Sequence, residues 1–263
     1  MRIMITNDDG ITAPGLAVLK SIADEIAGPS GEVWTIAPAT EQSGVGHTTS
    51  YNRPTAFFKV GARVFAVEGS PADCVILGLH EILKDTPPDL VLSGVNRGNN
   101  AAENVLYSGT IGAAIEAALQ GHRAIALSQF YGPENRDLAN PFEAASEHGV
   151  SIVQRLLGDG DWTPGGYRLF YNVNFPPTAA KNVKGTRVAA QGFRPDSAFK
   201  GQKQDAPSGR AFFWVSGGPQ HTPSAPGTDA AVNLEGHISI TPMRCELTAH
   251  DALDQLEARL NDG

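Results

Sequence analysis

Arg2-Ile3-Met4-Ile5-Thr6-Asn7-Asp8-Asp9-Gly10 is the segment from which the architecture of this chain is read. Its first five residues form a short apolar run, as a buried strand does, and its last four form a polar turn. Pro14 then opens a helical pattern that places Leu16, Leu19, Ile22, Ala23 and Ile26 on one face. A second strand is expected over residues 32–37. This strand–helix–strand unit predicts a parallel sheet covered by helices.

The alternation of helices and strands continues to about residue 173. Further helices are expected over residues 71–83, 111–119 and 142–157, and further strands over residues 90–92, 124–127 and 169–173. The pattern predicts an α/β fold with a mostly parallel sheet, and we assign residues 1–180 to this catalytic core.

The composition changes after Pro176-Pro177. From residue 181 to residue 226 the chain is rich in Gly, Pro, Ser and Lys, with short β-like runs at 186–189 and 211–215. A strand at 238–241 and a helix at 247–260 follow. We predict that residues 181–263 form an extension, in which a β-hairpin arm serves oligomerisation. Its apolar content is too low for a core of its own.

Composition and charge limit the possible functions. The 263 residues are 41% hydrophobic and 18% charged, which is typical of a globular protein, and the formal net charge is −8. An acidic surface argues against binding a nucleic acid polymer. The two cysteines have no metal-ligand spacing, which argues against structural zinc. We see no secretory signal and no membrane-spanning segment, and we expect a cytoplasmic protein with no membrane partner.

Asp8 and Asp9 carry the strongest chemical signal in the sequence. Two adjacent carboxylates directly after a buried strand repel each other unless a cation lies between them. In open parallel sheets, ligands bind outside the carboxyl ends of the strands. Oxygen ligands suit Mg²⁺, Mn²⁺ or Ca²⁺. A turn of Asx residues that caps the next helix explains the same residues equally well.

Three further segments follow predicted strands or precede a helix. Ser43 offers a hydroxyl from the glycine-flanked loop 41–47, and Asn96 offers a neutral oxygen from the amide-rich segment 93–100. Ser108-Gly109-Thr110 precedes an apolar helix, whose free N–H groups favour an anion. Taken singly, these are an ordinary loop, a solvated turn and a helix cap. Their expected convergence on one sheet edge favours a site for phosphate and a divalent metal.

Eight groups of residues, in order along nearly the whole chain, resemble the SurE family of stationary-phase survival proteins. They are Ile5-Thr6-Asn7-Asp8-Asp9-Gly10 with Ala13-Pro14-Gly15; Ala37-Pro38 with Gln42-Ser43-Gly44; Gly69-Ser70-Pro71-Ala72-Asp73-Cys74-Val75; Ser93-Gly94-Val95-Asn96 with Gly98 and Asn100; Tyr107-Ser108-Gly109-Thr110; Asn172-Val173-Asn174; Gly227-Thr228-Asp229; and Ser239-Ile240-Thr241-Pro242.

This resemblance implies a Rossmann-like, three-layer core and an extension used in dimer or tetramer assembly. It implies hydrolysis of nucleoside 5′-monophosphates, with 3′-monophosphates and short polyphosphate as further substrates, and one divalent cation, Mg²⁺ or Mn²⁺, whose place Ca²⁺ can take. Carried over by position, the metal ligands are Asp8, Asp9, Ser43 and Asn96, with Asp8 and Asp9 also catalytic. The phosphate and substrate residues are Asn100, Ser108, Gly109, Thr110 and Asp229.

The chain also departs from the family pattern. An acidic pair is common where this chain has Glu103-Asn104, so one carboxylate is replaced by an amide.

From the motifs and the resemblance together, we expect a metal-dependent phosphomonoesterase that acts on nucleoside monophosphates and assembles as a homodimer or homotetramer. A non-catalytic, nucleotide-binding regulator is the alternative. A phosphatase with an aspartyl-phosphate intermediate is disfavoured because the chain lacks the DxDx[TV] pattern.

Overall fold

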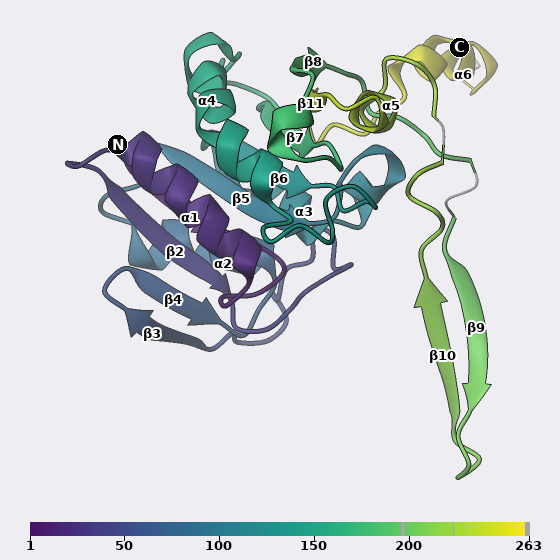
Figure 1. The fold of residues 1–263 in the computed structure, drawn as a ribbon, viewed down its shortest axis with the longest axis horizontal. Helices are drawn as coiled ribbons and strands as arrows, with labels where there is room; N and C mark the ends of the chain where they lie inside the picture. Colours follow the sequence, from purple (N-terminus) through teal and green to yellow (C-terminus); the bar gives the residue numbers. More distant parts are fainter. Residues whose placement is uncertain (196–197, 223, 261–263) are drawn as a thin grey trace.

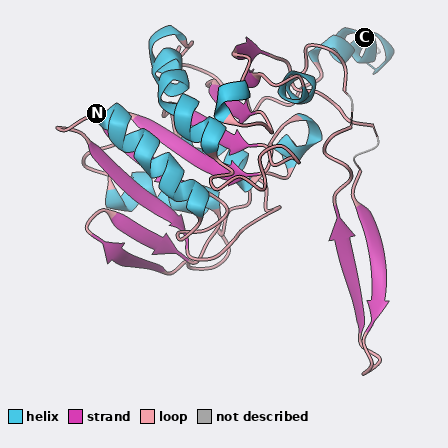
Figure 2. Cartoon of the chain, in the orientation of Figure 1, coloured by secondary structure: helices cyan, strands magenta, loops and turns pink. Residues whose placement is uncertain are grey.

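The structure, a computed structural model, describes residues 1–195, 198–222 and 224–260. Its central feature is a nine-stranded sheet (Figures 1 and 2). In spatial order the strands are β3 (Phe57–Gly61), β4 (Val64–Val67), β2 (Glu32–Pro38), β1 (Arg2–Thr6), β5 (Leu90–Arg97), β6 (Ala124–Gln129), β7 (Phe170–Phe175), β11 (Ile238–Met243) and β8 (Thr186–Val188).

Most neighbouring strands of this sheet are parallel, as predicted. The antiparallel pairs are β3 with β4 and β7 with β11. Strand β1 lies between β2 and β5 and is parallel to both, with Ile5 opposite Thr35 on one side and Leu92 on the other. The carboxyl ends of β1, β2 and β5 therefore meet at one edge of the sheet, where the sequence places its polar segments.

Helices cover both faces of the sheet. They are α1 (Pro14–Ala27), α2 (Pro71–Leu77), α3 (Gly109–Leu119), α4 (Glu143–Asp159), α5 (Asp229–Leu234) and α6 (His250–Leu260). Along β1, Ile3 and Ile5 belong to the core that α1 and α4 cover, whereas Met4 belongs to the core under α2 and α3. Adjacent strand residues point to opposite faces, so this alternation defines three layers.

Several boundaries differ from the sequence prediction. Residues 71–83 form α2 and then a separate π-helical turn, Gly78–Ile82. Strand β5 continues to Arg97 rather than ending at residue 92, and helix α5 and strands β3 and β4 were not predicted. Phe57 and Phe58 are both exposed on β3, so the pattern of a half-buried strand is absent there.

The C-terminal region contributes strands to two different sheets. Strands β8 and β11 join the main sheet, whereas β9 (Lys200–Asp205) and β10 (Ala211–Ser216) pair only with each other. This hairpin projects from the body of the molecule (Figure 1). The division of the chain at residue 180 stays a prediction, and residues 196–197, 223 and 261–263 of the predicted extension lie outside the described residues. Within the described part of the chain, every helix is too short or too polar to span a bilayer.

Candidate active site at the carboxyl ends of the strands

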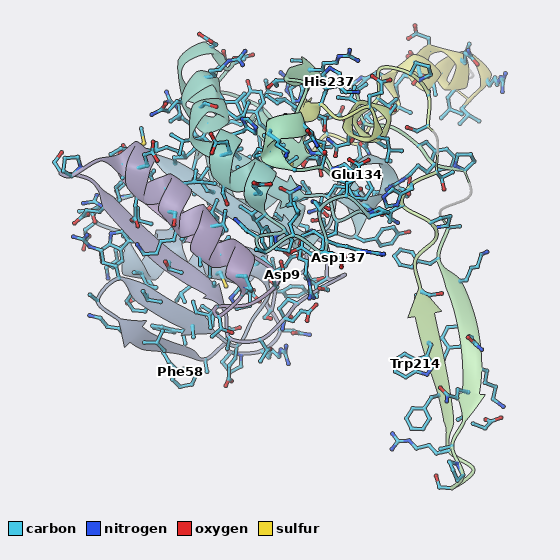
Figure 3. All side chains as sticks on the ribbon, viewed as in Figure 1. Asp9, Phe58, Glu134, Asp137, Trp214 and His237 are labelled. Atoms are coloured by element: carbon cyan, nitrogen blue, oxygen red, sulfur yellow. The ribbon has the colours of Figure 1, made fainter. Side chains whose placement is uncertain are left out.

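A cavity of about 450 Å³ opens at the carboxyl ends of β1, β2 and β5. Six of the residues predicted from sequence line it: Asp8, Asp9, Ser43, Asn96, Asn100 and Ser108. Asp9 lies at this edge of the sheet, close to one end of α1 (Figure 3). A groove of about 600 Å³ beside Trp34 is larger, but the charged side chains that line it, among them Glu32 and Arg63, pair with one another. The strand-end cavity is therefore the better candidate for chemistry.

Asp8 is buried at the end of β1, with 4% of its surface exposed. Burial raises the pKa of its carboxyl to about 6, the hydroxyl of Thr110 opposes this by donating a hydrogen bond, and the neighbouring charge of Asp9 adds to the rise. A carboxylate in this position is held in a defined orientation, but too little positive charge surrounds it to offset the cost of burying its ionised form.

Asp9 is less buried and faces a mixed environment. Burial raises the pKa of Asp9, the backbone N–H and the charge of Arg97 oppose this rise, and the charge of Glu41 adds to it. The N–H of Arg97 donates to the carboxylate of Asp9 at 3.0 Å. Asp8, Asp9 and Glu41 thus bring three carboxyl groups to one cavity that also holds the single guanidinium of Arg97.

Ser43 lies on a loop that backbone hydrogen bonds fix against the site. The N–H of Gln42 donates to the carbonyl of Asp8 at 2.7 Å, and the N–H of Gly46 donates to the carbonyl of Tyr107 at 3.0 Å. The Ser43 hydroxyl donates to the carboxylate of Glu41 at 2.8 Å. These contacts hold Ser43 at the cavity that Asp8 and Asp9 also line.

Asn96 reaches the cavity because β5 is irregular. The register of β5 against β6 shifts between Ser93 and Asn96. Gly94 sits in this irregularity with φ +133°, and a Cβ atom there would lie 2.1 Å from the carbonyl oxygen of Leu127. Only glycine fits this close approach. The side-chain NH₂ of Asn96 donates to the carbonyl of Gly98 at 2.9 Å, which leaves the side-chain oxygen for a ligand.

The start of α3 meets Asp8 directly. Ser108 caps the helix by accepting a hydrogen bond from the N–H of Ile111 at 3.1 Å. A Cβ atom on Gly109 would lie 2.8 Å from the Cβ of Asp8, so glycine is needed for this contact. Thr110 is fully buried and bonded to Asp8. Part of the predicted phosphate cradle therefore holds a carboxylate of the protein, while Ser108 faces the cavity.

Asn100 belongs to a buried network of side-chain amides. Its backbone N–H donates to Asn174 at 2.7 Å, its carbonyl accepts from Asn172 at 2.7 Å, and its side chain donates to Ser128 at 2.8 Å. The Asn172-Val173-Asn174 segment, which the sequence showed only as a match to a family pattern, thus holds Asn100 in the wall of the cavity.

The substrate-binding role predicted for Asp229 stays a prediction. The residue is fully buried and is not among the residues that line the cavity. Its carboxylate accepts hydrogen bonds from the backbone N–H groups of Ala102, Gly192 and Ala230. These hydrogen bonds tie Asp229 to the segment that contains Ala102, which follows Asn100 in the sequence.

Arg194 is a residue of the site's surroundings that sequence reasoning missed. Its side chain is 0% exposed, its Nε lies 3.0 Å from the carboxylate of Glu103, and it donates to the carbonyl of Ala101 at 2.9 Å. The residue lies in the polar run between 181 and 226, where an arginine is ordinarily solvated. Nothing in its local sequence signals burial. Two further residues line the cavity. Tyr107 was noted only as part of a family motif, and Phe199 was not noted at all.

The oxygen-rich set of Asp8, Asp9, Ser43 and Asn96 fits a hard divalent cation. Burial raises the pKa values of both carboxyl groups, the charge of Asp9 adds to the rise in Asp8, and the charge of Glu41 adds to the rise in Asp9. A cation beside the two carboxylates offsets these effects. Carboxylate, hydroxyl and amide oxygens are ligands that Mg²⁺ and Mn²⁺ accept. Among the described residues, no group of three or more His, Cys, Asp and Glu side chains is placed to bind a metal. A site here therefore needs the neutral oxygens.

The comparisons with known proteins agree with this arrangement. A family model described as "Survival protein SurE" matches residues 3–197. The chain belongs to the SurE family. A protein of Roseobacter denitrificans named "5'-nucleotidase SurE" is 64% identical over 256 residues, which cover 97% of this chain and 98% of that protein. A Ruegeria pomeroyi protein of the same name is 61% identical over 99% of this chain and 100% of its own length.

A solved SurE structure confirms the predicted Rossmann-like fold. The crystal structure of the SurE protein from Aquifex aeolicus is similar to this chain, with a TM-score of 0.80 and 32% sequence identity. The similarity covers 98% of this chain and 99% of that one. The C-terminal part of the chain therefore has its counterpart in a SurE protein, as the N-terminal part does.

Proposed function

We propose that this protein is a metal-dependent 5′-nucleotidase, which hydrolyses nucleoside 5′-monophosphates to nucleoside and phosphate. One observation carries the proposal. Oxygen donors from the ends of β1 and β5 and from the loop after β2 line the same cavity as Ser108, at the amino end of α3. The names of the relatives at 61–65% identity support the same activity.

The metal ligands in this proposal are Asp8, Asp9, Ser43 and Asn96, and the metal is Mg²⁺ or Mn²⁺. Such a cation supplies Lewis-acid stabilisation of the charge that develops on the phosphoryl oxygens. Thr110 keeps Asp8 oriented, and the loop contacts of Gln42 keep Ser43 in place. Ser108 and the amino end of α3 attract the phosphate group.

Asp9 is the better candidate for the general base. It lines the cavity and is less buried than Asp8, so its carboxylate is more accessible to an attacking water. Asp8 is fixed by Thr110 and is suited to holding a metal rather than to moving a proton. In this assignment the oxygen of water bonds to phosphorus and its proton passes to Asp9. The phosphorus–oxygen bond to the nucleoside breaks, and the departing 5′-oxygen takes up a proton from solvent.

The proposal extends to the setting of the enzyme. A cytoplasmic location agrees with the free thiols of Cys74 and Cys245. A homodimer or homotetramer agrees with the apolar side chains that the projecting hairpin exposes, such as Phe213 and Trp214. Sedimentation velocity on the full chain distinguishes the two assemblies from a monomer.

Phosphate release tests the activity. The purified chain is incubated with a panel of nucleoside 5′- and 3′-monophosphates and with short polyphosphate, in Mg²⁺, in Mn²⁺ and in excess chelator. We expect release from the 5′-monophosphates with either metal and none with chelator. Nucleotide binding without release under any metal would replace the proposal by the non-catalytic regulator.

A further inference from the structure

Two aromatic rings stand at the rim of the candidate active site. Tyr107 directly precedes Ser108, and Phe199 directly precedes the arm strand β9. Their ring centroids are 4.7 Å apart and the rings are nearly perpendicular. Both residues line the cavity that Asp8 and Asp9 line. They are 44% and 50% exposed, so each ring retains a surface that a ligand can cover.

The cavity is therefore polarised between its two ends. Asp8, at the inner end, is 4% exposed and carries charge, whereas the aromatic rings at the outer end are half exposed and apolar. A nucleoside monophosphate has the same polarity, because its ribose separates a charged phosphate from a planar aromatic base. With the phosphate at the inner end, the base reaches toward the rim.

The register of the arm explains why Phe199 and Val215 share this position. Gly201 pairs with Val215 and Lys203 pairs with Phe213 in the antiparallel hairpin. Side chains alternate across a strand, so Phe199, Val215 and Phe213 occupy one face. Phe212 and Trp214 lie on the opposite face, where Trp214 donates to Gln204 at 2.8 Å. The face with Phe199 and Val215 is the one that closes the cavity.

We infer that Tyr107, Phe199 and Val215 form the subsite for the nucleobase, so that the base of the arm completes the substrate site. The inference rests on the proposed function. Aromatic side chains bind bases by stacking, and every base offers a π face, so this subsite binds purines and pyrimidines alike. It separates nucleotides from phosphate esters that lack an aromatic group.

The ratio of kcat/KM for two substrates, measured after one ring is removed, tests the subsite. We compare kcat/KM for adenosine 5′-monophosphate with kcat/KM for ribose 5-phosphate, which has the same phosphate and sugar but no base. In Phe199→Ala the value for the nucleotide falls by about 5- to 100-fold through KM, whereas the value for ribose 5-phosphate stays at the wild-type level. Phe199→Tyr restores the preference because it retains a ring.

A matched control comes from the other face of the same hairpin. Phe212→Ala removes the same side chain from a neighbouring position, and it leaves the ratio unchanged. Equal losses with both substrates in Phe199→Ala indicate that the ring only supports the fold, and this result overturns the inference. Wild-type values of kcat/KM with both substrates in Phe199→Ala overturn it as well.

Adenosine binding separates this inference from the proposed activity. Adenosine has no phosphate to hydrolyse, so ligand-detected NMR measures its binding even in a protein that releases none. Binding to the wild type that weakens about 5-fold or more in Phe199→Ala supports the subsite, whatever the activity. A wild type that neither prefers the nucleotide to ribose 5-phosphate nor binds adenosine has no base subsite.

Discussion

The hydroxyl of Thr110 donates a hydrogen bond to the carboxylate of Asp8, across 102 positions of sequence and with 2.5 Å between the two oxygens. This bond joins the amino end of α3 to the carboxyl end of β1. Close contact between the two elements also requires Gly109, where a Cβ atom would meet Asp8 at 2.8 Å. The orientation of Asp8 thus depends on a helix that begins about a hundred residues later.

Replacing Thr110 by valine removes this donor while keeping a side chain of similar size. A hydrogen bond to a charged group stabilises by about 1.5–3 kcal/mol. We therefore expect Thr110→Val to weaken Mn²⁺ binding by about 10-fold or more in isothermal titration calorimetry. Thr110→Ser restores the hydroxyl and most of the affinity. Wild-type affinity in Thr110→Val would show that the bond has no part in metal binding.

Asp8 also predicts how the metal-free protein responds to pH. The folded pKa of about 6 lies above the ordinary 3.8, so between these values the folded state binds more protons than the unfolded state. The ionised carboxylate therefore destabilises the metal-free fold above pH 6, by about 3 kcal/mol, and this effect disappears as the pH falls toward 4.

Asp8→Asn removes that charge. We expect urea unfolding in chelator at pH 7.5 to show a variant more stable than the wild type by up to about 3 kcal/mol, with the difference shrinking at pH 4.5. A variant less stable than the wild type at pH 7.5 would contradict the description of Asp8 as a buried charge in need of a cation.

The Arg194–Glu103 pair predicts a contrast between a buried and an exposed ion pair. Arg194 is fully buried, and removing one partner of such a pair costs about 3–5 kcal/mol. Arg187 and Glu235 are 2.6 Å apart but about half exposed, and such pairs contribute about 1 kcal/mol or less. Urea unfolding is expected to show a large loss in Arg194→Met and a small one in Arg187→Met. Similar losses in both would contradict a stabilising role for the buried Arg194–Glu103 pair.

His47 anchors the loop that carries Ser43, and we expect this anchor to affect metal binding. Its Nε2 lies 2.7 Å from the carboxylate of Glu116, a largely buried residue of α3. Without this contact the loop loses an anchor, so His47→Ala is expected to raise the Mn²⁺ concentration at half-maximal activity several-fold, with kcat at saturating metal near the wild-type value. His80→Ala, which removes an exposed histidine bonded to Gln120, is the control. A lower kcat with unchanged metal dependence would indicate another role.

The sequence predicted those features that depend on nearby residues. The run from Arg2 to Thr6 is apolar and Asp8 and Asp9 follow it at once, so both the strand and its polar end are visible locally. The parallel arrangement of β1, β2 and β5 follows from the helices between them. Given that topology, the carboxyl ends of the strands meet, and Ser43, Asn96 and Ser108 reach one cavity.

The features that the sequence did not reveal depend on distant contacts. Arg194 is buried because Glu103 and Ala101, about 90 positions earlier, surround its guanidinium. Asp229 accepts hydrogen bonds from backbone amides of two distant segments, at Ala102 and Gly192, which its local sequence did not indicate. Strand β3 is an exposed edge strand, so it lacks the alternation that marks half-buried strands. No local pattern encodes these relationships.

Phosphate release from adenosine 5′-monophosphate by Asp9→Asn, measured across a Mn²⁺ titration, tests the metal-dependent activity most directly. Asp137→Asn is the control, because Asp137 is an acidic side chain that is 84% exposed and does not line the cavity. We predict that Asp9→Asn loses release by about 100-fold or more at every metal concentration, while Asp137→Asn matches the wild type. Undiminished, metal-dependent release in Asp9→Asn would contradict the placement of the metal and of the catalytic base at this cavity.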